Sequence, residues 1–202
     1  MKLYYGKLSP FVRKVMVLAH EKNLVSKLDL VPVTLTPTEP DRNLMRVNPL
    51  GKIPTLVLDD GSVLIDSPVV CEYLDGLGDG PKLVPANGSA RFHALSLNAL
   101  GDGVLHAGMN VRVEGLRPAG TQWEPWIAAQ QLKVDNAIDA LNAGAFVPSS
   151  TVITLGEIAV GCALGWLDFR MSQFDWRSSR PSLAAWYAAF AARPSMQATA
   201  PK

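Results

Sequence analysis

The chain of 202 residues is poor in cysteine and has no marked excess of charge of either sign. Its two cysteines, Cys71 and Cys162, lie far apart and form no Cys-x-x-Cys pair, which excludes a disulfide framework and a cysteine-rich zinc site. The 19 lysines and arginines are balanced by 18 acidic residues, so the chain lacks the dense positive field that binding to a phosphate backbone needs. Nucleic acid is therefore not an expected partner.

Long apolar runs are also missing. The longest uncharged apolar stretch, Ile158 to Leu167, is about half of the ~20 residues that a membrane-spanning helix needs, so it predicts a buried helix. The first residues, Met1 to Gly6, contain no apolar segment typical of a secretory signal. Hydrophobic residues make up 48% of the chain and charged residues 18%, which predicts a globular protein. We therefore expect a cytoplasmic protein without a membrane span.

The N-terminal part of the chain alternates between strand and helix patterns. Lys2–Tyr5 is a short strand-like run, and apolar positions recur at helical spacing through Pro10–Lys22. Asp29–Thr34 predicts a second strand, in which Pro32 favours an edge position because proline cannot donate to a central ladder. The next segment, Leu35–Asn48, is rich in loop-forming residues.

A hairpin and a third helix are expected next. The runs Pro54–Leu58 and Val63–Ile65 flank an Asp-Gly pair, which is a strong turn signal between strands. Ser67 as the N-cap and Pro68 at the first helical position then predict a helix that continues through Leu74. This order of elements predicts an α/β domain.

A stretch rich in glycine and proline divides the chain. It occupies residues 78–88 and predicts a linker between an α/β domain, residues 1–77, and an all-helical domain, residues 89–202. Four apolar stripes at helical spacing indicate the second domain's helices: Leu97, Leu100, Val104, Ala107 and Val111; Ile127, Val134, Ile138 and Leu141; Ile158, Cys162, Ala163 and Trp166; and Leu183, Trp186, Tyr187 and Phe190. Thr154 and Glu157 have the spacing of a capping box, which has a role in folding.

Two short segments have the composition of a binding site. Pro54 stands where a strand begins, so Ile53-Pro54 is a candidate cis bond that would leave the N–H and C=O of Ile53 free to pair with an extended peptide. Asp66 and Ser67 combine a carboxylate, a hydroxyl and the amides of a helix N-terminus, which together can hold a small zwitterion. The alternative is that Asp66 and Ser67 only cap the helix.

The chain resembles the glutathione transferases over essentially its whole length, and among them the serine-type bacterial members. The motifs that carry the resemblance are Ser9-Pro10-Phe11, the run from Asn48 to Pro54, Asp66-Ser67, and the run from Thr154 to Ala159. The resemblance implies a thioredoxin-like N-terminal domain followed by a helical C-terminal domain. It also implies glutathione as co-substrate, a small electrophile as second substrate, no metal, and a homodimer.

The resemblance assigns a role to each matching residue. Ile53 would pair its backbone with the cysteinyl part of glutathione, ahead of a cis Pro54, and Asp66 and Ser67 would bind the γ-glutamyl end. Ser9 would donate a hydrogen bond to the glutathione thiol and favour the thiolate, which is the nucleophile. Ser9 could instead serve only as the N-cap of the helix that begins at Pro10, and the two roles are compatible. Tyr5 is a weaker second candidate for the catalytic residue.

Other positions are less specific. The residues of the second-substrate pocket would include His106, Met109 and Arg112, although such a set is more often ordinary packing or solvated surface. The glycine carboxylate of glutathione has three candidate partners: Arg42, Arg46 and Lys52. The three histidines lack the spacing of metal ligands.

Three functions remain open at this point. The leading hypothesis is an enzyme that activates the glutathione thiol and adds it to a small electrophile, as in detoxification. The second is a binding or interaction module that keeps the fold with little or no conjugation, because fold alone does not establish function. The third, a glutathione-dependent isomerase, is less favoured because Ser9 to Arg13 lacks the additional serine and cysteine of those relatives. Mixed-disulfide chemistry is disfavoured because no cysteine lies near Ser9.

Overall fold

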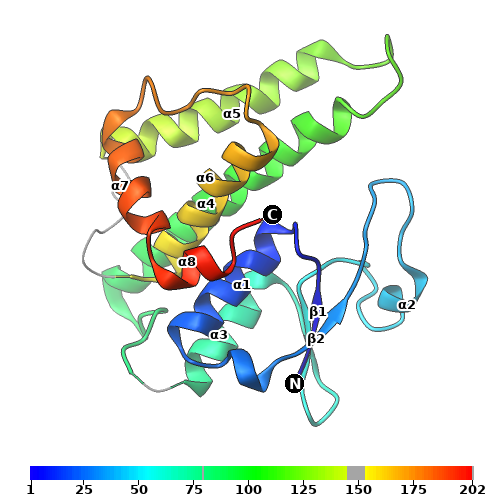
Figure 1. Ribbon diagram of the computed structural model, residues 1–202, viewed down its shortest axis with the longest axis vertical. Helices are drawn as coiled ribbons and strands as arrows, with labels where there is room; N and C mark the ends of the chain where they lie inside the picture. The colour runs from blue at the N-terminus through cyan, green and yellow to red at the C-terminus, as the bar shows by residue number, and fades with distance from the viewer. Residues whose placement is uncertain (79, 145–152, 202) are drawn as a thin grey trace. The chain divides into compact units, whose positions relative to one another are not determined.

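The computed structural model describes residues 1–78, 80–144 and 153–201 (Figure 1). The chain forms two compact units, one of Met1–Ala86 together with Pro194–Lys202 and one of Asn87–Arg193. The first unit contains a small mixed sheet with helices, and the second is built from helices. This is the α/β plus all-α architecture that the sequence predicts.

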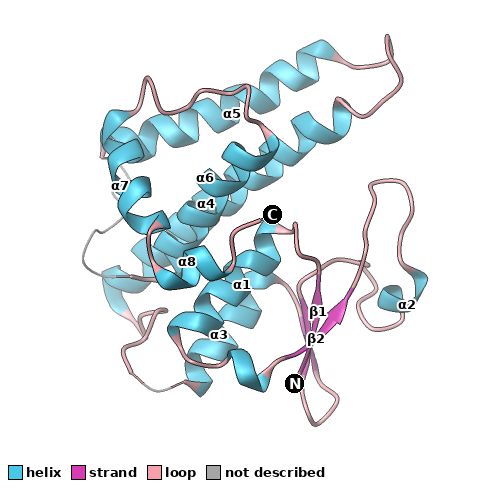
Figure 2. Cartoon of the chain, viewed as in Figure 1, coloured by secondary structure: helices cyan, strands magenta, loops and turns pink. Residues whose placement is uncertain are grey.

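A four-stranded sheet forms the centre of the first unit (Figure 2). Its strands are β1 (Lys2–Tyr5), β2 (Asp29–Pro32), β3 (Thr55–Val57) and β4 (Val63–Leu64), in the spatial order β2-β1-β3-β4. β1 runs parallel to β2 and antiparallel to β3, and β3 and β4 form the predicted antiparallel hairpin. β2 lies at an edge and ends at Pro32, two residues earlier than predicted, and its edge position agrees with the missing donor of proline.

Two helices cover one side of this sheet. They are α1 (Pro10–Glu21) and α3 (Ser67–Leu77), which pack against each other, and Figure 2 shows the single turn α2 (Arg42–Met45) on the opposite side. A short 3-10 helix, η1 (Val25–Lys27), leads into β2. The buried apolar side chains of the strands and helices, among them Leu3, Leu56 and Leu74 with no exposed surface, form the core of this unit.

Three local expectations for the first unit are wrong. The N-cap of α3 is Asp66 and not Ser67, because the carboxylate of Asp66 accepts the N–H of Ser67, which becomes the first helical residue. The helix also continues beyond Leu74 to Leu77. The segment predicted as loops contains α2, which begins where the Asp41 carboxylate accepts the N–H groups of Asn43 and Leu44 at 2.8 and 2.9 Å.

The C-terminal segment returns to the first unit. The helix α8 (Pro194–Ala198) packs on α1, where the guanidinium of Arg13 donates to the carbonyl of Met196 at 3.1 Å and to Thr199 Oγ1 at 3.4 Å. The hydroxyl of Ser195 donates to Glu21 at the end of α1. The sequence pattern predicts this segment as part of the helical domain, because it is helical like the residues before it.

The second unit consists of α4 (Gly88–Glu114), α5 (Glu124–Ala143), α6 (Leu155–Arg170) and α7 (Pro181–Ala191). α4 packs against α5 and α6, and α7 packs against α5 and α6 (Figure 1). The predicted capping box is present at the start of α6, where Thr154 Oγ1 accepts the N–H of Gly156 and the Glu157 carboxylate accepts the N–H of Thr154 at 2.8 Å. Cys162 is buried on α6, and Cys71 of the first unit is likewise a buried free thiol.

Glycines let α4 and α6 approach closely and fix how they are aligned. A Cβ atom at Gly101 would lie 2.8 Å from the carbonyl carbon of Ala159, and one at Gly108 would lie 2.7 Å from the ring of Trp166. One at Gly156 would lie 2.6 Å from Cβ of Leu97. Because residue numbers rise together along both helices, α4 and α6 run parallel.

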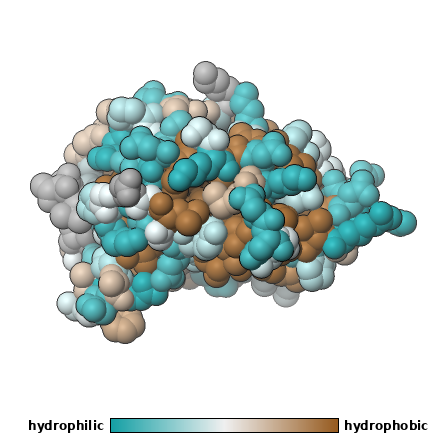
Figure 3. All heavy atoms as spheres, turned by 90° about the horizontal axis from the view of Figure 1, so that it is seen from below, coloured by the Kyte–Doolittle hydropathy of each residue, from teal (hydrophilic) through white to brown (hydrophobic). Residues whose placement is uncertain are grey.

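On the face that Figure 3 shows, hydrophilic and hydrophobic side chains lie next to one another. Several large apolar side chains remain exposed, with Phe92, Leu50 and Trp123 each more than 60% exposed. Exposed apolar residues of this kind are normal when they are scattered. Among the described residues, no helix is long and apolar enough to cross a membrane.

Candidate functional site

Three segments that the sequence marks as candidates meet at one end of the sheet. β1 and β3 are antiparallel with Tyr4 opposite Thr55, so the loop after β1 lies next to the residues before β3. β4 is antiparallel to β3 with Leu64 opposite Leu56, so the chain leaves β4 toward the same end. The loop that contains Ser9, the Ile53-Pro54 pair and the Asp66-Ser67 pair are therefore neighbours, and α1 and α3 both begin there.

Ser9 is the N-cap of α1. Its Oγ accepts the N–H of Val12 at 3.3 Å, and its own N–H donates to the carbonyl of Gly6 at 3.0 Å, which closes a tight turn between β1 and α1. Pro10 follows at the first helical position. The hydroxyl accepts one hydrogen bond in this arrangement and keeps its proton available for donation to another group. Ser9 is partly exposed, so a ligand can reach it.

Ile53 packs against the same turn. A Cβ atom at Gly6 would lie 2.5 Å from Cδ1 of Ile53, so the glycine makes room for the isoleucine side chain beside the loop that carries Ser9. The Ile53-Pro54 bond is cis, and Pro54 is buried. Among the described residues, none forms a hydrogen bond with the N–H or C=O of Ile53. Both backbone groups are therefore available to an extended peptide.

A buried asparagine holds the loop before Pro54 in place. Asn48 donates through Nδ2 to the carbonyl of Lys52 at 3.0 Å and to Thr55 Oγ1 at 2.9 Å, and its Oδ1 accepts the N–H of Leu50 at 3.0 Å. Gly51 has a φ of 59°, a left-handed conformation that favours glycine. The sequence analysis gave Asn48 no role of its own. The Asn-Pro-x-Gly pattern signals the turn, but the asparagine's cross-loop hydrogen bonds depend on the folded backbone.

Asp66 and Ser67 differ sharply in their surroundings. Asp66 is exposed, and one of its carboxylate oxygens accepts the N–H of Ser67 at the start of α3. Ser67 is 1% exposed, and its Oγ has no hydrogen-bond partner among the described residues. A buried hydroxyl without a partner costs free energy, so such a group in a native protein calls for an explanation. At this position the explanation would be a polar ligand atom.

The remaining candidates are less constrained. Arg42, Arg46 and Lys52, the possible partners of a glycine carboxylate, are all exposed. Tyr5 ends β1 and is partly exposed. His106, Met109 and Arg112 lie on α4 in the second unit. Residues 1–78, 80–144 and 153–201 contain no group of three or more His, Cys, Asp or Glu side chains that could hold a metal ion.

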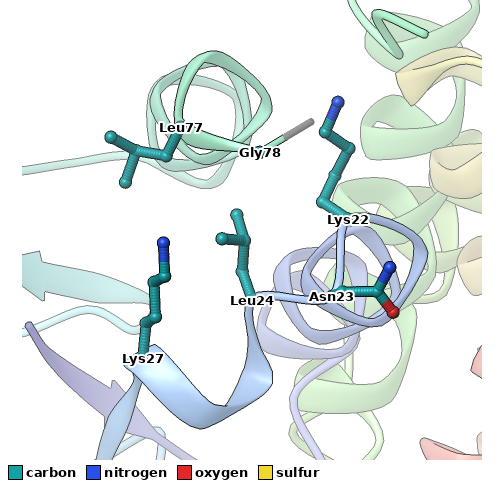
Figure 4. Close-up of a pocket in the computed structure, with 6 residues that line it drawn as sticks. All are labelled: Lys22, Asn23, Leu24, Lys27, Leu77 and Gly78. Atoms are coloured by element: carbon teal, nitrogen blue, oxygen red, sulfur yellow. The ribbon is translucent and has the colours of Figure 1, made fainter. Parts of the chain in front are cut away.

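Enclosed space in the first unit lies away from these residues. A pocket of about 140 Å³ is lined by Lys22, Asn23, Leu24 and Lys27, after the end of α1, and by Leu77 and Gly78 at the end of α3 (Figure 4). It therefore lies at the opposite ends of the two helices whose N-termini meet at Ser9 and Asp66. Peptide binding by strand addition needs open backbone groups, which the end with Ser9 offers, and needs no enclosed cavity.

Two family models match this chain. The model for the glutathione S-transferase N-terminal domain matches residues 8–77, and the model for the glutathione S-transferase C-terminal domain matches residues 124–189. A curated relative, the uncharacterized GST-like protein YibF of Escherichia coli strain K12, is 33% identical over 186 residues. That match covers 91% of this chain and 90% of YibF.

Solved structures are similar over the full length. A glutathione transferase family member from Pseudomonas fluorescens Pf-5 with bound glutathione has a TM-score of 0.96 and 44% identity, covering 100% of this chain and 98% of that one. A second structure of that family member, with bound S-(propanoic acid)-glutathione, has a TM-score of 0.92 and 43% identity, with both chains fully covered. A glutathione S-transferase from Methylobacillus flagellatus KT with glutathione bound has a TM-score of 0.88 and 37% identity, covering 100% of this chain and 99% of that one.

Proposed function

Because this chain belongs to the glutathione S-transferase family, we propose that it binds glutathione and transfers it to a small electrophile. Glutathione would lie across the end of the sheet where Ser9, Ile53 and Ser67 meet. The observation that carries the proposal is the buried Ser67 hydroxyl, which has no partner among the described residues and stands beside the exposed carboxylate of Asp66.

The chemistry of that end of the sheet matches the functional groups of glutathione. The free carboxylate oxygen of Asp66 would accept hydrogen bonds from the γ-glutamyl ammonium group, and the Ser67 hydroxyl would donate to the γ-glutamyl carboxylate. The N-terminus of α3 adds a partial positive charge that favours the same carboxylate. The N–H and C=O of Ile53, ahead of Pro54, would pair with the cysteinyl backbone in the manner of an added strand.

Ser9 would activate the thiol. Its hydroxyl can donate to the bound sulfur while it accepts from Val12, and the N-terminus of α1 favours negative charge at the same point. Lowering a thiol pKa of about 8.5 by about two units needs only ~2.7 kcal/mol of preferential stabilisation of the thiolate. The thiol proton passes to solvent, and the thiolate sulfur bonds to the electrophilic carbon. In a substitution the leaving group departs with the electron pair of its bond to that carbon, and in an addition the π electron pair moves to the adjacent atoms, which take up a proton from solvent. Ser9 forms no covalent bond in this scheme.

Similar proteins support this assignment. Two solved relatives, from Pseudomonas fluorescens and Methylobacillus flagellatus, hold glutathione, and one of them also holds a glutathione conjugate that carries a carboxylic acid. We further propose that the protein is a cytoplasmic homodimer that acts in detoxification, as the family resemblance implies. Light scattering after size exclusion would give the mass of the assembly, and the mass of one chain would contradict the dimer.

Isothermal titration with glutathione tests the proposal. We expect the wild-type protein to bind, Asp66→Ala and Ser67→Ala to weaken binding strongly, and Asp60→Ala to bind like wild type. Asp60 is a matched control because it is an exposed aspartate of the same unit that accepts a backbone N–H, from Ser62 at 2.8 Å. No binding by the wild-type protein would contradict the proposal.

A screen of electrophiles then separates an enzyme from a binding module. Turnover with at least one electrophile, lost in Ser9→Ala, supports the transferase. Glutathione binding that raises the melting temperature, together with no turnover over the whole panel, would instead support the binding module, because ligand linkage reports binding without chemistry.

A further inference from the structure

Two arginines are brought together by the alignment of α4 and α6. The contacts described above place Gly101 against Ala159 and Gly108 against Trp166. One helical turn further along each helix, on the same faces, stand Arg112 and Arg170. Figure 1 shows α4 and α6 side by side in this parallel arrangement. Arg112 and Arg170 therefore stand at neighbouring positions near the C-terminal ends of the two helices.

The acids nearest to them in the chain are already engaged by other arginines. Glu114 forms an ion pair with Arg117 at 3.5 Å and accepts the N–H of Trp123 at 3.0 Å. Asp168 forms a bidentate ion pair with Arg177, in which Nη2 of Arg177 lies 2.6 Å from Oδ2 of Asp168. Hydrogen bonding to Asp168 raises the pKa of Arg177 above its usual range. Neither acid is left to neutralise the two arginines on α4 and α6.

Arg112 and Arg170 themselves make no hydrogen bond or ion pair with a described residue. The guanidinium of Arg170 instead stacks 4.5 Å above the ring of Phe169, which is 37% exposed. Burial lowers the pKa of Arg170 from its usual range, and the like charge of Arg112 lowers it further. The pair thus carries positive charge that no acidic side chain among the described residues balances.

We propose that Arg112 and Arg170 form a binding site for the carboxylate of a small organic acid, with the ring of Phe169 as an apolar support for the Arg170 guanidinium. An arginine can bind a carboxylate with two parallel hydrogen bonds, and an anion between two adjacent arginines offsets the repulsion between their positive charges. The stacking on Phe169 holds Arg170 in place before the ligand arrives.

The helix ends decide which anion is favoured. Phosphate sites commonly use the N–H groups at a helix N-terminus, which favour a doubly charged group. Here two helices present their C-terminal ends, where the carbonyl groups carry partial negative charge. A singly charged, planar carboxylate therefore fits this position better than a phosphate monoester.

A simpler role is also possible for each arginine, since cations near a helix C-terminus stabilise the helix. That role predicts a small loss of stability in Arg112→Met and Arg170→Met, with no effect on the choice of ligand. Ligand selectivity therefore distinguishes the two roles.

Titration with 4-nitrobenzoate, 4-nitrobenzamide and 4-nitrophenyl phosphate tests the site directly and without glutathione. We expect wild-type protein to bind 4-nitrobenzoate more tightly than the other two compounds, and Arg112→Met and Arg170→Met each to weaken that binding about tenfold. Arg117→Met is the matched control, since Arg117 is an exposed arginine of the same unit whose charge Glu114 balances. Equal binding of the acid by wild type and both variants would overturn the site, and a preference for the phosphate would overturn the carboxylate assignment.

Discussion

The two ends of the helix pair α1 and α3 are built in opposite ways. At the N-terminal ends, the Ser67 hydroxyl is buried and has no hydrogen-bond partner among the described residues. The N–H and C=O of Ile53 likewise form no hydrogen bond with a described residue. At the C-terminal ends, Lys22 and Asp75 form a buried ion pair at 3.3 Å, with both side chains at most 3% exposed. The first end offers polar groups to a ligand, and the second end uses its polar groups within the fold.

Both members of this ion pair have further partners. The Asp75 carboxylate accepts the N–H of Leu83 at 2.9 Å and of Val84 at 3.0 Å. Lys22 donates to the carbonyl of Pro81 at 3.1 Å. These hydrogen bonds hold the segment after α3 against the end of α1. A buried ion pair with this many hydrogen bonds is strongly destabilised when one member is removed, because the other charge remains buried.

The comparison shows that a buried polar group indicates a ligand site only where the protein itself supplies no hydrogen-bond partner for it. Both ends contain buried polar side chains, but the partners at one end come from the chain itself. At the other end the partners of the Ser67 hydroxyl and of the Ile53 backbone are missing from the described residues, and the proposed ligand would supply them. Four substitutions test this contrast, one at the C-terminal ends of α1 and α3 and three at or beside their N-terminal ends.

The largest expected effect is on stability at Lys22 and Asp75. Replacing Asp75 by asparagine should lower the free energy of unfolding by about 3–5 kcal/mol, because the ammonium group of Lys22 stays buried without its counter-charge. Chemical denaturation measures this change. The double substitution Lys22→Met with Asp75→Leu should recover much of the loss, and a loss below about 1 kcal/mol in the single variant would show that the pair is not important.

The second effect is on catalysis at Ser9. Replacing Ser9 by alanine should lower kcat about 100-fold, the equivalent of ~2.7 kcal/mol, because the thiolate loses its donor. Loss of the N-cap should cost about 1 kcal/mol of stability. Steady-state kinetics and glutathione titration measure both parts, and Ser9→Thr should recover part of kcat. Equal losses in kcat and in glutathione affinity would count against thiol activation.

The third effect is on glutathione binding at Ser67. Ser67→Ala should weaken glutathione binding about tenfold and leave the stability of the free protein unchanged or slightly higher, because the buried hydroxyl without a protein partner is removed. Titration and thermal melting without glutathione give the two numbers. A clear drop in the melting temperature of the free protein would mean that the hydroxyl has a structural partner. It would contradict the contrast between Ser67, without a partner, and Asp75, with several.

The smallest effect is expected at Gly6. Gly6→Ala would place a Cβ atom 2.5 Å from Cδ1 of Ile53, so the isoleucine must move away from the loop that carries Ser9. Because the contact involves the flexible end of a side chain, we expect a loss of about 0.5–1 kcal/mol in glutathione binding, seen as a severalfold rise in KM. Gly76→Ala, in α3 of the same unit with open space around it and no left-handed φ, is the control for general effects of a glycine-to-alanine change. No change in KM would show that Ile53 tolerates displacement.

Much of the fold follows from local patterns. The strands, the hairpin and the helices are predictable because side-chain periodicity and turn residues act over a few neighbouring positions. The N-cap at Ser9 and the capping box of Thr154 and Glu157 are predictable for the same reason, and both are present. The assignment of the N-cap of α3 was wrong by one residue, because aspartate and serine are equally good caps and only the backbone conformation selects between them.

Contacts between distant residues were not predictable. The sequence contains Lys22 and Asp75, but nothing local shows that they meet in the core, and the same is true of Arg13 with Met196. The alignment of α4 with α6, which brings Arg112 to Arg170, depends on close packing at Gly101 and Gly108. Short-range rules do not contain this information.

The sequence by itself determined the two-part architecture, the helix caps, and the residue types at the candidate glutathione site, since these depend on local periodicity, turn chemistry and short motifs. Only the tertiary structure decided which of these residues are neighbours and which lack partners. Burial and hydrogen-bond satisfaction are properties of the folded surroundings, and Ser67 shows the difference: its hydroxyl can be read from the sequence, but its burial without a described partner appears only when the chain is folded.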